Sequence, residues 1–196
     1  MDCPKKIRRV SLFGGPNTGK STLAARLFAE LKLMGYNCEL VTEYVKTWTY
    51  NDRKPESFDQ VYILGQQIRR EDTALRGGFD FIITDSPVGL SCFYAQQLGT
   101  KFWRHEFEIA RCLDQQYPSL NFLVTTERKP ADYNDCGRFQ TFEQAAELDE
   151  ELWYFMLENY LKTNFNIVPR DNYEFMKRIV LENVCSQFEL PQQEKK

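Results

Sequence analysis

A stretch near the N-terminus has the residue types and the spacing that bind a phosphate group. It reads Gly14-Gly15-Pro16-Asn17-Thr18-Gly19-Lys20-Ser21, which is glycine, four residues, and then Gly-Lys-Ser. Glycines let successive backbone N–H groups turn toward a phosphate, and a helix opening near Gly19 presents further unpaired N–H groups. We expect Lys20 to reach the β- and γ-phosphates of a nucleotide, Ser21 to bind Mg²⁺, and Thr22 to belong to the same nucleotide-binding set.

The sequence on either side has the context that this motif requires. Apolar residues predict a strand over residues 8–13, and leucines at positions 23, 27 and 31 recur at helical spacing after the motif. Strand, loop and helix therefore follow one another, as in a P-loop.

Two carboxylates follow predicted strands and are candidates for the chemistry. Glu43 ends a strand over residues 37–42, and Asp85 ends a short apolar strand over residues 79–84. The carboxyl ends of parallel strands face the ligand crevice, so both should lie on the side of the P-loop. One would hold Mg²⁺ or its water and the other would take a proton from an acceptor hydroxyl, and the sequence leaves open which does which.

A cationic segment over residues 126–140 is the candidate lid. It lies between a fourth strand and a long helix, and it carries Arg128 and Arg138, which would fold over the transferred phosphoryl group and neutralise its oxygens.

A helix expected over residues 57–75, with Ser57 as its N-cap, would form a wall of the acceptor site. Gln66 and Arg69 on this helix would read an acceptor base, because an amide offers a donor and an acceptor together. Trp48 and Phe58 are candidates for stacking on that base.

Strands and helices alternate along the whole chain. This pattern predicts an α/β P-loop NTPase fold, a three-layer sandwich with a parallel five-stranded sheet and helices on both faces. We expect a single domain over residues 1–190 and a frayed polar tail over residues 191–196.

Composition bears on the partners and metal sites that the chain could have. The chain has 196 residues, a formal net charge of −3, one histidine and six cysteines that form no Cys-x-x-Cys pair. These numbers do not favour nonspecific binding to nucleic acid or a zinc site. No apolar run approaches the roughly 20 residues of a membrane span, so we expect a cytoplasmic protein without a membrane partner.

A P-loop indicates a nucleotide and leaves the reaction open. A guanine-nucleotide switch would carry Asn-Lys-x-Asp after a late strand, and the sequence has none. An AAA-type motor would usually continue into a helical lid domain, for which this chain is too short. A small-molecule kinase needs an acceptor pocket and a cationic lid, and both have candidates here.

Several motifs resemble those of nucleoside and nucleotide kinases. The stretch from Glu43 to Trp48 is similar to the Glu-Pro-Val-x-x-Trp motif of deoxyribonucleoside kinases, whose glutamate is the base. Asp85-Ser86-Pro87 stands where those kinases carry Glu-Arg-Ser, without the arginine. Residues 42–48, Asp85-Ser86-Pro87 and Gly137-Arg138-Phe139-Gln140 more closely resemble bacteriophage P-loop kinases related to nicotinamide riboside kinase.

That resemblance implies a substrate. Some of these phage kinases phosphorylate 5-hydroxymethyluracil in phage DNA, so it implies transfer from ATP, with Mg²⁺, to the hydroxymethyl group of that base, in the host cytoplasm if the chain is phage-encoded. A free nucleoside or nucleoside monophosphate is the second possible acceptor. A nucleotide-binding switch or ATPase without an acceptor is the third possibility.

Overall fold

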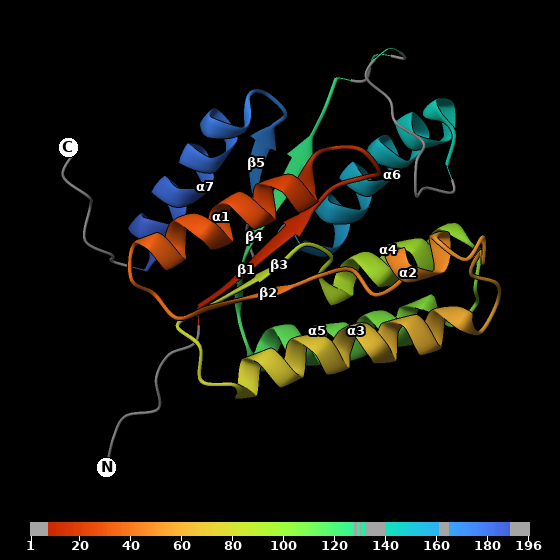
Figure 1. The fold of residues 1–196 in the computed structure, drawn as a ribbon. Coiled ribbons are helices and arrows are strands. Elements are labelled where there is room, and N and C mark those ends of the chain that lie inside the picture. The colour runs from red at the N-terminus through yellow and green to blue at the C-terminus, as the bar shows by residue number, and fades with distance from the viewer. Residues whose placement is uncertain (1–7, 128, 130, 132–139, 161–164, 189–196) are drawn as a thin grey trace.

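We describe the chain from a computed structural model, which places residues 8–127, 129, 131, 140–160 and 165–188. Five parallel strands form one sheet in the order β2-β3-β1-β4-β5, and helices lie on both sides of it (Figure 1). The strands are β1 (Arg8–Phe13), β2 (Cys38–Val41), β3 (Phe81–Thr84), β4 (Ser119–Thr125) and β5 (Phe165–Pro169). The helices are α1 (Lys20–Leu33), α2 (Lys46–Thr49), α3 (Asp59–Arg76), α4 (Val88–Gln97), α5 (Trp103–Gln116), α6 (Phe142–Tyr160) and α7 (Tyr173–Gln187). The predicted α/β P-loop fold with five parallel strands is confirmed.

The central strand β1 separates two apolar cores, because successive side chains of a strand point to opposite faces. Val10 and Leu12 pack with α1 and α7 on one face of the sheet. Phe13 packs with α4, α5 and α6 on the other face. Arg9 points to that second face as well, and its burial is described below. Helices on both faces keep the parallel sheet away from solvent, as such sheets require.

The strand order places the site at one edge of the sheet. Strand β1 lies between β3 and β4, and the segments after β1, β2 and β3 all leave from the carboxyl edge. The P-loop, Glu43 and Asp85 therefore share that edge, as expected. Ligands of open α/β sheets bind in the crevice outside this edge.

One detail of the sequence analysis is revised. Helix α3 begins after Phe58, and Ser57, the expected N-cap, has a φ of 41° and does not cap it. The apolar residues Val61 and Tyr62 of this helix are 46% and 51% exposed. Residues 46–49 form the short helix α2.

No helix in the described part of the chain is long and apolar enough to cross a membrane. The expected tail over residues 191–196 lies outside the described residues.

Candidate functional site

The P-loop turns between β1 and α1, and two of its glycines are required by its geometry. Gly14 has a φ of 154°, and a Cβ there would lie 2.8 Å from both the Thr18 Oγ1 and the Val124 carbonyl oxygen. Gly19 has a φ of 91°, and a Cβ there would lie 2.9 Å from the Tyr173 hydroxyl. A side chain at either position would be strained and crowded, so these glycines keep the loop in its narrow turn.

Side chains of the motif fold back on the loop itself. Lys20 Nζ donates a hydrogen bond to the Gly15 carbonyl at 2.9 Å, and Thr18 Oγ1 donates to the same carbonyl at 3.0 Å. Arg170, which follows β5, donates to the Asn17 carbonyl at 2.9 Å. The loop is therefore held from its own end and from a segment far along the chain, with the Lys20 ammonium beside the turn where a phosphate would lie.

Glu43 and Asp85 lie at the ends of neighbouring strands. The Asp85 backbone N–H donates to the Val41 carbonyl at 3.0 Å, which ties the end of β3 to the end of β2. The Asp85 side chain is 5% exposed, and its Oδ1 is buried without a hydrogen-bond partner among the described residues. A buried carboxylate oxygen without a partner is costly, so a ligand or ion at this atom would be strongly favoured.

These groups fit the demands of a magnesium ion. Mg²⁺ is usually held by one or two carboxylates, by waters and by substrate phosphates, rather than by a complete protein cage. Asp85 and the exposed hydroxyl of Ser21 supply oxygen ligands of that kind. The described residues contain no group of three or more His, Cys, Asp or Glu side chains that could hold a metal ion alone.

A cavity of about 490 Å³ joins the P-loop to the other end of the site. It is bordered by the P-loop, by the segment from Glu43 to Pro55, and by helices α3 and α4. Its lining residues are Pro16, Asn17, Lys20, Ser21, Glu43, Tyr44, Val45, Lys46, Thr49, Tyr50, Lys54, Pro55, Gln60, Ile63, Gln67, Ser86, Ser91, Tyr94, Gln97, Leu98, Gln140 and Leu148. Its size is typical of a site for one small molecule.

The residues predicted to bind the acceptor lie mostly elsewhere. Gln66, Arg69, Trp48 and Phe58 are not among the residues that line the cavity. Trp48 is buried, with the Arg53 guanidinium 3.7 Å from its ring centroid, and Phe58 is 70% exposed and stacks on Phe102.

Gln67, the neighbour of Gln66, lines the cavity and was missed. Its Oε1 accepts the Tyr44 backbone N–H at 3.1 Å, and this bond fixes which end of the amide carries the nitrogen. Its Nε2 is buried without a partner among the described residues. Gln67 therefore offers a donor at the wall of the cavity, where Gln66 was expected to offer a donor and an acceptor together.

The predicted lid cannot be placed. Arg128 and Arg138 lie outside the described residues, together with most of residues 126–140. Gln140, at the end of that segment, lines the cavity. A second cavity of about 440 Å³ lies beside Gly15, between the end of β4 and the acidic side of α6 that carries Asp149 and Glu150.

Residues 9–175 match the family described as AAA domain, which is most of the chain. The chain belongs to this family. The match covers the domain, residues 9–175, and does not bear on the sequence argument that set an AAA-type motor aside because of chain length. No curated protein matches the sequence.

Solved structures with this fold include one of NadR. NadR in complex with NAD and AMP-PNP superposes with a TM-score of 0.74 at 16% identity, over 97% of this chain and 52% of the NadR chain. This chain thus spans about half the length of NadR.

Two thymidylate kinases also share the fold. The enzyme of Candida albicans superposes with a TM-score of 0.67 at 11% identity, over 97% of this chain and 96% of its own. The enzyme of Ehrlichia chaffeensis gives 0.64 at 12%, over 91% and 98%. At such identities the similarity shows the fold alone.

Proposed function

We propose that this AAA-domain protein is an ATP- and Mg²⁺-dependent kinase that transfers the γ-phosphoryl group to a hydroxyl of a nucleoside-type acceptor. The observation that carries the proposal is one cavity of about 490 Å³ that is lined by Lys20 and Ser21 of the P-loop and also by Glu43 and Gln67. A phosphotransferase needs both a phosphate cradle and an adjoining pocket for the acceptor. The kinases among the structures with this fold support the reaction class.

Each residue has a role in this proposal. The P-loop amides and Lys20 hold the β- and γ-phosphates, and Ser21 and Asp85 would hold Mg²⁺, which neutralises phosphate charge when bound. Glu43 lines the cavity and takes the proton of the acceptor hydroxyl, since a base must lie within hydrogen-bond reach of that proton. The orphaned Oδ1 of Asp85 favours the metal role for Asp85 and leaves the base to Glu43. Arg128 and Arg138 would close over the transferred group.

The acceptor is proposed from the hydrogen-bonding capacity of Gln67. Since its Oε1 is committed to the Tyr44 N–H, its Nε2 is available to donate to a carbonyl of a planar ring. The 5-hydroxymethyl group of 5-hydroxymethyluracil in DNA is our leading acceptor, because a uracil ring carries such carbonyls.

A DNA acceptor also requires a surface for the strand around the flipped or unpaired base. Lys46, Tyr50 and Lys54 line the cavity, and Tyr50 is 67% exposed. Aromatic and cationic side chains of this kind bind single strands. A free nucleoside or nucleoside monophosphate is the second candidate, and the cavity volume, which suits one such molecule, favours it.

The test is transfer of labelled γ-phosphate from ATP to a panel of acceptors. The panel holds DNA with 5-hydroxymethyluracil, ordinary DNA, thymidine, deoxynucleoside monophosphates and nicotinamide riboside. Label in modified DNA alone supports the leading acceptor, and label in a free nucleoside or nucleotide supports the second. ATP hydrolysis with no labelled acceptor would contradict the kinase proposal and leave an ATPase or switch. Lys20→Ala is the control for a contaminating kinase.

A further inference from the structure

One turn of helix α3 holds the backbone of both strand ends that carry the proposed catalytic carboxylates. Gln67 and Glu71, four residues apart on the buried side of α3, are 1% and 0% exposed. Gln67 Oε1 accepts the N–H of Tyr44, the residue after Glu43, and Glu71 Oε1 accepts the N–H of Val88 at 2.9 Å. Val88 lies three residues after Asp85, at the start of α4.

The bond from Val88 is a helix cap supplied from outside the helix. The first N–H groups of a helix have no partner within it, and a side chain just before the helix usually accepts one of them. The N-cap of α4 is Pro87, which makes no side-chain cap bond. The Glu71 carboxylate takes this place and also puts negative charge at the positive end of α4, which is favourable.

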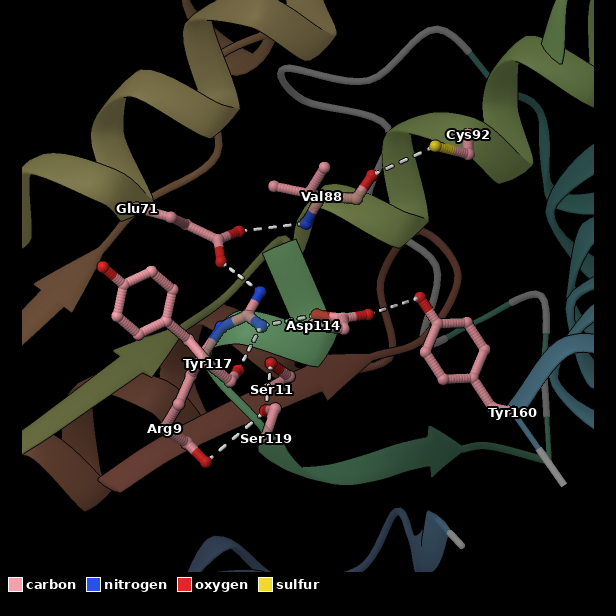
Figure 2. Close-up of polar contacts among 9 residues, drawn as sticks. All are labelled: Arg9, Ser11, Glu71, Val88, Cys92, Asp114, Tyr117, Ser119 and Tyr160. Atoms are coloured by element: carbon pink, nitrogen blue, oxygen red, sulfur yellow. Dashed lines mark hydrogen bonds and ion pairs between the residues drawn. The ribbon is translucent and has the colours of Figure 1, made fainter. Parts of the chain in front are cut away.

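Glu71 is itself held by a buried ionic cluster on the same side of the sheet. Figure 2 shows Arg9 of β1 between Glu71 of α3 and Asp114 of α5, paired with both. Arg9 also donates to the Tyr117 carbonyl at 3.2 Å, and the Tyr160 hydroxyl donates to Asp114 at 3.4 Å. The cluster thus fixes Glu71 against the central strand, which leads directly into the P-loop.

Stabilisation of the fold alone does not account for the contacts of Glu71 with both Arg9 and Val88. A buried ion pair often stabilises a fold no more than apolar residues of the same volume would. The particular contribution of Glu71 is geometric, since of the two carboxylates on Arg9 it is Glu71 that accepts the N–H of Val88.

We propose that Glu71 is a positioning residue that, through Val88, sets the place of Asp85 relative to Glu43 and the P-loop. This inference rests on the proposed function, in which Asp85 holds Mg²⁺. It matters because catalytic groups must be held to within about 0.5 Å of their working geometry. The neighbouring Arg70 reinforces the other strand end, since it donates to the Thr42 carbonyl at 3.2 Å.

The experiment compares Glu71→Asp and Glu71→Gln with Asp114→Asn as the matched control. Glu71→Asp keeps a carboxylate for Arg9 but shortens its reach to Val88, so it separates the cap from the charge and should fold. Asp114→Asn weakens the other ion pair of Arg9 without touching α4. Stability is followed by urea unfolding, the cap by hydrogen exchange of the Val88 amide, and metal dependence by calorimetry of ATP binding with and without Mg²⁺.

We expect Glu71→Asp to lose protection at Val88 and to need about tenfold more Mg²⁺ for tight ATP binding, by analogy with small misplacements at catalytic sites. Glu71→Gln keeps a side-chain oxygen that can accept the Val88 N–H, so its protection and its Mg²⁺ dependence should change less. In transfer assays Glu71→Asp should lower kcat with little change in the KM of the acceptor, whereas Asp114→Asn should change stability alone. Equal Mg²⁺ dependence in Glu71→Asp and Asp114→Asn would overturn the inference.

Calorimetry of ATP binding distinguishes failure of the kinase proposal from failure of the positioning role of Glu71. If the wild-type protein labels no acceptor at all, the proposed kinase function fails, yet the Mg²⁺ dependence of ATP binding still decides the role of Glu71. If wild-type ATP binding is independent of Mg²⁺, the positioning role through Asp85 is wrong, whatever the acceptor assay shows.

Discussion

The two ends of the cavity are built in different ways. At the phosphate end, one continuous stretch of eight residues, from Gly14 to Ser21, provides glycines with positive φ, a lysine and a hydroxyl. At the acceptor end, side chains come from the segment after β2, from α3 and from α4. The first end depends on backbone shape and the second on which side chains of separate helices face inward.

This difference determines how each end responds to substitution. Backbone amides of the P-loop cannot be removed by a side-chain substitution. Of the groups at the phosphate end that a substitution can remove, we therefore expect Lys20 to contribute most to phosphate binding and transfer. The acceptor end has several polar side chains, each with a smaller share of the binding. The experiments below test this contrast, in order of expected effect on transfer.

Lys20→Ala should have the largest effect. Loss of the ammonium beside the transferred phosphoryl group should lower kcat by roughly a hundredfold or more, as for other preorganised charge-stabilising groups. Steady-state transfer kinetics measure the effect, and urea unfolding should show an intact fold. Lys32→Ala, at the far end of the same helix, is the control. Retained transfer in the Lys20 variant would remove the P-loop from the mechanism.

Asp85→Asn and Glu43→Gln should separate two roles at the strand ends. Asp85→Asn should weaken transfer by about a hundredfold at low Mg²⁺ and recover in part as Mg²⁺ is raised, because the lost group is a metal ligand. Glu43→Gln should lower kcat by a similar factor at every Mg²⁺ concentration, since it removes the base. Titration of Mg²⁺ in the transfer assay distinguishes them. Full turnover of the Glu43 variant at saturating Mg²⁺ would show that Glu43 is not the base.

Gln67→Met should have a smaller effect than either. The variant loses the proposed bond to the acceptor and also the bond from the Tyr44 N–H, at about 1 kcal/mol each, so we expect a roughly thirtyfold fall in kcat/KM for the acceptor and little change in the KM for ATP. Gln66→Met is the matched control one position away, outside the residues that line the cavity. A larger effect at Gln66 than at Gln67 would restore the sequence prediction and contradict our reading of α3.

Glu106→Gln should leave transfer unchanged and alter stability. Glu106 lies in α5 at 4% exposure with both carboxylate oxygens unpartnered among the described residues, and burial raises its pKa from 4.5 to about 7. The folded chain keeps a proton that the unfolded chain releases, so this group lowers stability as the pH rises from about 4.5 to about 7. In Glu106→Gln the free energy of unfolding should decrease less between these pH values, and the difference from the wild-type decrease should reach up to roughly 3 kcal/mol at pH 8.

Urea unfolding across this pH range gives the measurement for Glu106. Glu108→Gln on the same helix is the control, because Glu108 is exposed and pairs with Arg111 at 3.1 Å. An unchanged pH profile in Glu106→Gln would show that Glu106 titrates normally in the folded protein.

The fold and the phosphate end could be predicted because their signals are local. The strands are short apolar runs, and the strand at residues 8–13 matches its expected bounds. The P-loop motif fixes its own residues, and the carboxyl edge of a parallel sheet then places Glu43 and Asp85. None of these inferences requires the rotation of a helix about its axis.

The acceptor end is harder to predict because it does require that rotation. The apolar residues Val61 and Tyr62 of α3 are half-exposed, and Tyr62 lies against Tyr44 and Trp48. The buried side of α3 instead includes the polar residues Gln60, Gln67 and Glu71. Ile63, Leu64, Ala74 and Leu75 recur at helical spacing and share that side, and this pattern could have identified Gln67.

The hydrogen bond from Arg170 to the Asn17 carbonyl, and the place of the Tyr173 side chain beside Gly19, have a consequence for synthesis of the protein. During translation the phosphate motif leaves the ribosome long before the segment that supports it, and domains generally fold as units. A nascent chain that has not been extended past Tyr173 therefore carries the motif without a finished loop. Since a ligand stabilises the state that binds it, cellular ATP should favour chains synthesised beyond this point and leave shorter ones to proteases.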